Sequence, residues 1–170
     1  MTDTIPLWLH IVAATVWLGP QIFMFVVTVP AVRAIADRET RIQVLRVVTT
    51  RYGWLAWSAM LVLVLTGISN VFDHEDESGT SVLNFGWRYS WIFFTKMALV
   101  GLMIALTALH SFVVGPRQMA LAEQEEEESE ESARLRRSGI ILSSVNLLAA
   151  LATVFAAALL ANEAFSAREV

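Results

Sequence analysis

Four long stretches of the chain carry almost no charged residues, and the segments between them hold most of the charge. The apolar stretches cover residues 7–32, 54–72, 91–114 and 139–160. A helix needs about 20 apolar residues to cross the hydrocarbon core of a bilayer. Each stretch is apolar around its whole circumference, as a lipid-embedded helix must be, because its backbone polar groups are satisfied only within the segment. The pattern predicts an all-α integral membrane four-helix bundle that forms one domain over residues 1–170 in a lipid bilayer.

Composition supports this class and excludes several others. Hydrophobic residues make up 56% of the chain and charged residues 16%, against roughly 45–50% and about 25% in soluble domains. The absence of cysteine excludes disulfide scaffolds, iron–sulfur clusters and c-type haem attachment. A net charge of −4 argues against a nucleic-acid partner.

The arginines predict how the bundle is oriented. Nine of them fall in the two connections expected at residues 33–53 and 115–138, and only Arg88 and Arg168 fall on the opposite side. Cytoplasmic connections carry the excess of positive charge. We therefore expect a multi-pass protein of the cell inner (plasma) membrane with both termini outside. The first span lacks a basic region before it, so we expect it to be retained rather than cleaved.

The connections predict local features of their own. Residues 39–50 read as a short cytoplasmic helix, and residues 115–138 as a continuation of the third span into the cytosol, with seven glutamates between Glu123 and Glu131. We interpret these glutamates, and the acidic residues 73–77, as solvated segments rather than metal sites. Gly19 and Pro20 interrupt the first span, and a kink is expected there because proline removes a helix hydrogen bond.

Three ionisable side chains lie inside spans, where such residues are costly and usually mark function. They are His10, Lys96 and His110. His10 and Lys96 lie at nearly the same depth below the external face, because the first and third spans run parallel. His110 is about 21 Å further along the third span at 1.5 Å per residue. His10 and His110 therefore cannot be axial ligands of one haem within a single subunit.

Residues spaced by seven place these side chains on helix stripes, because positions seven apart share one helix face. The stripes are His10, Trp17 and Met24; Met60, Gly67 and His74; and Lys96, Met103 and His110. The methionines and glycine suit a seam between helices. An apolar seam has no use for an imidazole or an amine. Near the other face, Asn146 is a possible hydrogen-bond partner of His110.

A buried imidazole is a common axial ligand of haem iron. His10 is the candidate ligand, with Trp17 on its stripe and Gly67 leaving room for a flat macrocycle. Lys96 is a second ligand if its amine is neutral, or a partner of a propionate if it is charged, and Arg88 is a candidate for another propionate. His10 and His110 are the candidate metal ligands, and no catalytic residue is assigned.

Leu9, His10 and Ile11, followed by Trp17, Leu18 and Gly19 and by Pro30, resemble the first span of the copper-resistance D (CopD) superfamily. Trp91, Lys96, Leu99, Val100 and His110 make the third span similar to the HemJ-type protoporphyrinogen oxidase branch. That branch implies a haem b enzyme that oxidises protoporphyrinogen IX, with His10 and Lys96 as its important positions. The usual Leu-Pro-Arg is replaced here by Gln21, Ile22 and Phe23. The copper-resistance branch implies copper handling by histidine and methionine.

Three hypotheses follow. The first is a haem b-binding redox protein that acts on a tetrapyrrole as an oxidoreductase. The second is a copper permease or copper binder with His10, Met24, Met103 and His110 as a ladder of soft ligands. The third is a membrane scaffold without a cofactor. A homodimer would widen the wall that four short helices build around a macrocycle.

Overall fold

The computed structural model describes residues 4–78, 82–124 and 129–166 of the 170-residue chain. Its helices in chain order are α1 (Thr4–Phe23), η1 (Met24–Thr28), α2 (Val29–Arg33), α3 (Arg38–Ser78), α4 (Arg88–Leu109), η2 (His110–Val114), α5 (Gly115–Glu123), α6 (Glu130–Ala161) and α7 (Glu163–Ser166). The two η segments are π-helical turns. Four helical runs are long and apolar enough to cross a membrane: Thr4–Arg33, Arg38–Phe72, Arg88–Glu123 and Glu130–Ala161. The predicted all-helical membrane fold is confirmed.

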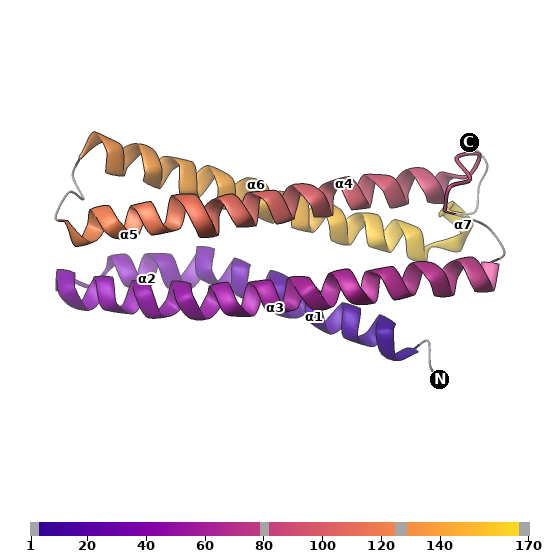
Figure 1. The fold of residues 1–170 in the computed structure, drawn as a ribbon, viewed down its shortest axis with the longest axis horizontal. Helices are drawn as coiled ribbons and strands as arrows, with labels where there is room; N and C mark the ends of the chain where they lie inside the picture. The colour runs from indigo at the N-terminus through magenta and orange to yellow at the C-terminus, as the bar shows by residue number, and fades with distance from the viewer. Residues whose placement is uncertain (1–3, 79–81, 125–128, 167–170) are drawn as a thin grey trace.

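The four spans form two antiparallel hairpins that lie on one another (Figure 1). The first hairpin packs α1 and α2 against α3, and the second packs α4 and α5 against α6. The α2–α3 and α5–α6 connections lie at one end of the bundle, and α1 begins at the opposite end, where α7 also lies. The arginine-rich connections therefore share one end, as the charge pattern predicts.

Helix α3 differs from the sequence-based expectation. We expected a connection over residues 33–53 that contained a separate short helix, but α3 is continuous for 41 residues from Arg38. The connection is reduced to residues 34–37 because Asp37 starts the helix: its Oδ2 accepts a 2.8 Å hydrogen bond from the Thr40 backbone N–H. Hydrogen bonds from Thr40 lower the pKa of the Asp37 carboxyl. The cap is therefore present above the ordinary carboxylate pKa and is lost as the pH falls through the lowered value.

Both hairpins widen into a π turn at the same place. The Val29 N–H bonds back to Met24 O, and the Gly115 N–H bonds back to His110 O. Each turn ends just before a proline, Pro30 in the first hairpin and Pro116 in the second. Helix α1 continues through Gly19 and Pro20 to Phe23, so these residues do not end the helix, and the π turn follows directly after it. A π turn absorbs the carbonyl that a following proline leaves without a donor.

The hairpins repeat one another, although the sequence shows no obvious repeat. Met24 and His110 are 86 residues apart, as are Pro30 and Pro116. The buried positions of α3 (Ala56, Ala59, Met60 and Thr66) recur 90 residues later in α6 as Asn146, Ala149, Ala150 and Ala156. Equivalent helices run in the same direction, which is the pattern of a parallel repeat around an axis along the membrane normal.

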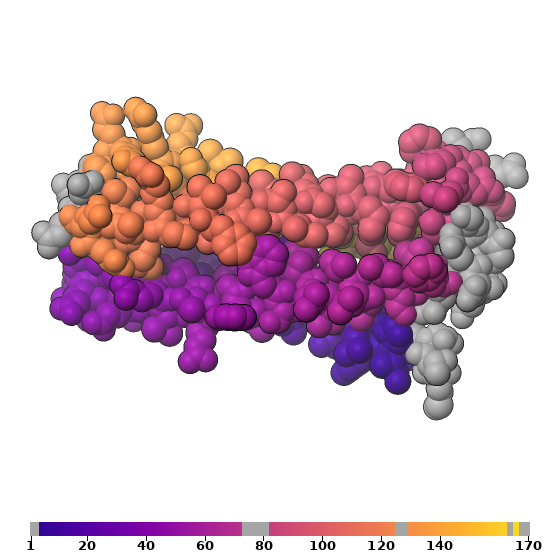
Figure 2. All heavy atoms as spheres, viewed as in Figure 1, coloured from indigo at the N-terminus to yellow at the C-terminus, as the bar shows by residue number. Residues whose placement is uncertain are grey.

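The core lies where the hairpins meet, half-way along the spans. It consists of seven buried residues in mutual contact: Trp17, Ala56, Ala59, Met60, Met103, Ala149 and Ala150. The four alanines let helix backbones approach closely, which is how membrane helices gain packing contacts. On the face that Figure 2 shows, the hairpins touch near the middle, and atoms of the helices behind are visible between them toward either end. Trp57 and Phe112 make one such contact, with ring centroids 5.6 Å apart.

We predict that Ala150→Leu destabilises the fold, because Ala150 is only 2% exposed and an enlarged side chain must displace its neighbours. Overpacking of this kind costs about 1–3 kcal/mol. Thermal unfolding in detergent, followed by tryptophan fluorescence, measures the effect. Leu148→Ala is the control, because Leu148 is 66% exposed. An equal loss in both variants would contradict the position of the core.

Candidate functional site

His10 is held against α3 by a hydrogen bond that determines its tautomer. Its Nδ1 lies 2.9 Å from Thr66 Oγ1. The Thr66 hydroxyl donates its own proton to Val62 O at 2.6 Å, so its oxygen is left to accept. Nδ1 must therefore carry the proton that His10 donates to Thr66. Nε2 then keeps its lone pair, which is the state in which an imidazole binds a metal.

Gly67 makes room for the His10 ring. A Cβ atom added at Gly67 would lie 3.3 Å from His10 Cε1 and 3.8 Å from His10 Nδ1. These contacts are tight enough that the ring would have to shift. The prediction that Gly67 belongs to the site agrees with this position, but its space is occupied by the imidazole itself.

Lys96 lies at the level of His10 on the equivalent helix of the second hairpin. The two residues are 86 positions apart, the separation that relates the two π turns. Lys96 is half-buried and is close enough to His10 to interact with it electrostatically. Among the residues that the structure describes, it has no hydrogen bond or ion pair. The predicted juxtaposition of imidazole and amine is therefore present, with no counter-ion between them.

Trp17 and Met103 lie seven residues further along their helices than His10 and Lys96. If His10 and Lys96 are the first level of the bundle, Trp17 and Met103 are the second. Trp17 is 3% exposed and belongs to the apolar core with Met60 and Met103. The sequence analysis grouped Trp17 with His10 as a cofactor contact, whereas here it packs between the hairpins. The Thr153 hydroxyl lies 3.4 Å from Met103 Sδ. Two thioethers thus lie in the middle of the bundle.

His110 occupies the third level, where it begins the π turn η2. Its Nδ1 is buried and has no hydrogen-bond partner among the described residues. The expected bond from Asn146 to His110 is absent: the Asn146 side-chain N–H donates instead to Thr107 Oγ1 at 3.4 Å. His110 and His10 belong to different levels, so they do not share one ligand.

Arg88 is separate from these levels. It is the first residue of α4, and its guanidinium carbon lies 5.3 Å from the centre of the Phe165 ring. This contact is a cation–π interaction. It attaches α7 to the start of α4, where Ser90 Oγ also donates to Asn84 O at 2.7 Å. Arg88 therefore has a structural partner at the end of the bundle.

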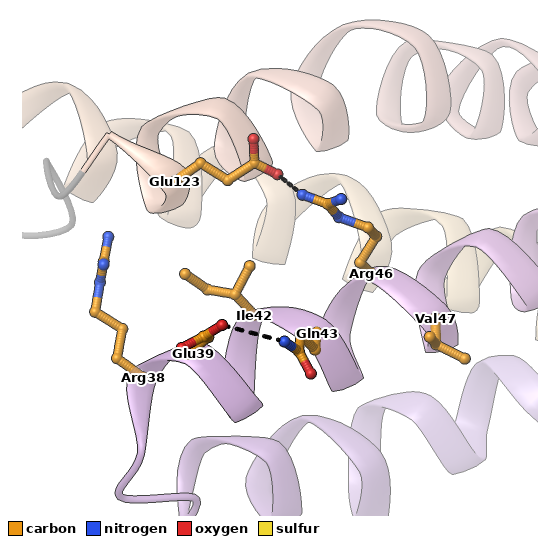
Figure 3. Close-up of a pocket in the computed structure, with 7 residues that line it drawn as sticks. All are labelled: Arg38, Glu39, Ile42, Gln43, Arg46, Val47 and Glu123. Carbon is orange, nitrogen blue, oxygen red and sulfur yellow. Dashed lines mark hydrogen bonds and ion pairs between the residues drawn. The ribbon is translucent and has the colours of Figure 1, made fainter.

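The hollow in Figure 3 lies at the arginine-rich end, between α3 and α5. It has a volume of about 600 Å³ and is lined by Arg38, Glu39, Ile42, Gln43, Arg46, Val47 and Glu123. An ion pair between Arg46 and Glu123 crosses it. Arg117 and Glu131 form a second pair at 2.6 Å at the same end. The Arg46–Glu123 pair joins the two hairpins, whereas the Arg117–Glu131 pair lies within the second hairpin, and neither involves a predicted site residue.

Carboxylates and histidines form no metal cluster in the described part of the chain, where no three of them converge. The segment of glutamates at residues 125–128 lies outside the described residues.

Sequence reasoning missed Thr66, although it is the residue that orients His10. Its only signal was a hydroxyl group next to Gly67 inside an apolar run. Threonine in a membrane helix commonly bonds its own backbone, as Thr66 does with Val62 O. The second use of its oxygen depends on the crossing of α1 and α3, which the sequence does not reveal.

The sequence profile of the family described as copper resistance protein D matches residues 46–160, about two thirds of the chain. This chain belongs to the copper resistance protein D family. The match covers three of the four spans and includes Lys96, Met103 and His110, whereas His10 lies before it. The family membership and the four apolar helices make this a multi-pass membrane protein. The further resemblance to the HemJ-type branch gains no support from the match.

No curated protein and no solved structure matches the chain. The family alone therefore supplies the functional context for the site.

We predict that Thr66→Val destabilises the protein by about 1 kcal/mol, because His10 then loses the acceptor of its Nδ1 proton inside the bundle. Chemical unfolding in mixed micelles measures the free energy. Thr95→Val is the matched control, because the exposed Thr95 hydroxyl bonds only to Trp91 O of its own helix. If both variants are equally stable, the His10–Thr66 bond does not hold the site.

Proposed function

We propose that this protein binds Cu(I) within its bundle and passes it from one side of the membrane to the other. The observation that carries the proposal is the succession of soft ligands on the two equivalent helices α1 and α4. His10 lies at the first level, Met103 at the second, and Met24 and His110 at the third. Seven residues separate the levels, about 10 Å along each helix. Membership in the copper resistance protein D family supports copper as the cargo.

The ligand chemistry fits this cargo. Cu(I) prefers thioether sulfur and imidazole nitrogen over the oxygen ligands that hard cations require. His10 offers a free Nε2 because its proton is on Nδ1, where it is donated in a hydrogen bond to Thr66 Oγ1. Met60 and Met103 offer two thioethers in the apolar core. Sites with few ligands bind weakly, and successive weak sites are what conduction through a membrane protein needs.

The charge pattern predicts how the path is oriented in the membrane. The arginines at the α2–α3 and α5–α6 end predict that this end faces the cytoplasm and that the protein lies in the inner membrane with its N-terminus outside. Copper that enters from outside would then meet His10 first and leave near His110. No group in this proposal changes oxidation state, and no enzymatic step is assigned.

Lys96 regulates access to His10 in this proposal. A protonated amine at the same level repels an arriving cation, because like charges at close range disfavour each other. The repulsion keeps the affinity at the first level low, so that copper moves onward to the thioethers.

The haem hypothesis uses the same free Nε2 of His10. Haem iron would bind there with Lys96 as partner, and the oxidation of protoporphyrinogen would follow from the HemJ resemblance. Copper is the better proposal because the family match names copper resistance and because the methionines lie on the path. A Soret absorption band in protein purified from haem-replete cells, lost in His10→Ala, would reverse this choice.

We predict that Met103→Leu weakens Cu(I) binding by about tenfold, because it removes a thioether ligand while keeping the volume of the core. Competition with a chromophoric Cu(I) chelator measures the affinity, in detergent and under reducing conditions. Met97→Leu is the matched control, because Met97 lies on the same helix with an exposed side chain. Equal affinities in wild type and Met103→Leu would exclude Met103 as a ligand, and an absence of binding in the wild type would exclude copper altogether.

We also predict that Lys96→Leu strengthens Cu(I) binding several-fold, because it removes a positive charge beside His10 without adding a polar group or a thioether. The same competition assay applies, and Lys96→Arg keeps the charge as a control. Weaker binding in Lys96→Leu than in Lys96→Arg would mean that a neutral amine is itself a ligand.

A further inference from the structure

Four buried polar atoms in the described part of the bundle lack a hydrogen-bond partner. They are Trp17 Nε1, Gln21 Oε1, His110 Nδ1 and Asn146 Oδ1. Gln21 is 8% exposed and Asn146 is 7% exposed. An unpaired polar group in the bilayer interior costs several kcal/mol. Four of them in one small bundle call for an occupant that bonds to them.

These atoms lie within about two helix turns of one another along the bundle, from the core toward the arginine-rich end. Gln21 follows Trp17 by one turn on the same face of α1. The hydrogen bond between Asn146 of α6 and Thr107 of α4 places these two residues at the same depth in the bundle. Thr107 is 86 residues after Gln21, so the hairpin repeat puts Gln21 at that level too. Helices α1 and α6 contact one another, and both amide side chains are buried.

His110 closes this group toward the arginine-rich end. It follows Thr107 by one turn of the same helix, and its buried Nδ1 is available to donate or accept. The amide groups, the imidazole and the indole come from three different spans. The arrangement is therefore a layer between the hairpins and not a feature of one helix.

The mixture of donors and acceptors identifies the occupant. The Trp17 indole N–H only donates, whereas the Gln21 and Asn146 oxygens only accept. A bare cation would satisfy the oxygens but repel the indole N–H. A water molecule can donate two hydrogen bonds and accept two, and buried waters typically make about three such bonds.

We propose that Gln21, Asn146 and His110 form an internal water site in the middle of the membrane. Trp17 closes the site on the side of the core and donates its indole N–H to the water. The site does not depend on the cargo proposed above. It makes the bundle polar from its centre toward the arginine-rich end. The apolar barrier to any polar cargo is then confined to the thin layer of Trp17, Met60 and Met103.

Nuclear magnetic resonance of the ¹⁵N-labelled protein in micelles tests the proposal. The six tryptophans give six indole N–H signals, and Trp17→Phe identifies the one from Trp17. We expect a magnetisation-transfer cross-peak between bound water and the Trp17 indole. Gln21→Leu and Asn146→Leu should each weaken this cross-peak at least threefold. Gln43→Leu, which changes an exposed glutamine on α3, should leave it unchanged.

The wild-type spectrum decides the matter even if a leucine variant fails to fold. A Trp17 indole signal with no water cross-peak would overturn the proposal. A cross-peak that persists at full strength in both leucine variants would also overturn it, because the water would then not be held by these amides. A higher melting temperature in Gln21→Leu, Asn146→Leu or both would indicate dry, unpaired amides and would count against the site.

Discussion

The close contact between two helical hairpins at a layer of alanines is the constraint on which the rest of this structure depends. Lipid tails are as apolar as the side chains they touch, so membrane helices associate by packing rather than by hydrophobic exclusion. Ala56, Ala59, Ala149 and Ala150 allow that packing around Trp17. Because equivalent residues of both hairpins meet there, the contact sets the relative height of every other position on α1 and α4.

The relative height of α1 and α4 determines which polar side chains lie beside one another in the interior. His10 comes level with Lys96, and Met24 comes level with His110. Polar side chains within a span must find partners inside the protein. His10 does so through Thr66, and that bond leaves its second nitrogen ready for a ligand. Lys96, without an ion-pair partner in the described chain, adds an amine at the same height.

Counting residues along the sequence predicts much of this arrangement. The number and position of the spans follow from apolar length, and the shared depth of His10 and Lys96 follows from helical rise and antiparallel connections. The lengths and positions of the spans could not predict which side chains contact one another between neighbouring helices. The partner of His10, the burial of Trp17 in the core and the contact of Arg88 with Phe165 depend on helix crossing and rotation. Neither is encoded in periodicity alone.

Two local features were missed for a different reason. The cap at Asp37 sets where α3 begins, and the helix then continues through the change from polar to apolar sequence that suggested a break. The π turns depend on prolines that act on the turn before them, so the break lies upstream of Pro30 and Pro116 and not at Pro20. The equal placement of these turns shows a repeat that sequence identity no longer displays.

Crystals of the protein loaded with Cu(I) under reducing conditions give the most direct test of the account, through anomalous scattering at the copper edge. The account predicts density between α1 and α4, beside the His10 imidazole or the thioethers of the core. Copper found only at the carboxylates of the bundle surface, with the interior free of it, would contradict the claim that the two hairpins enclose a path for a soft cation.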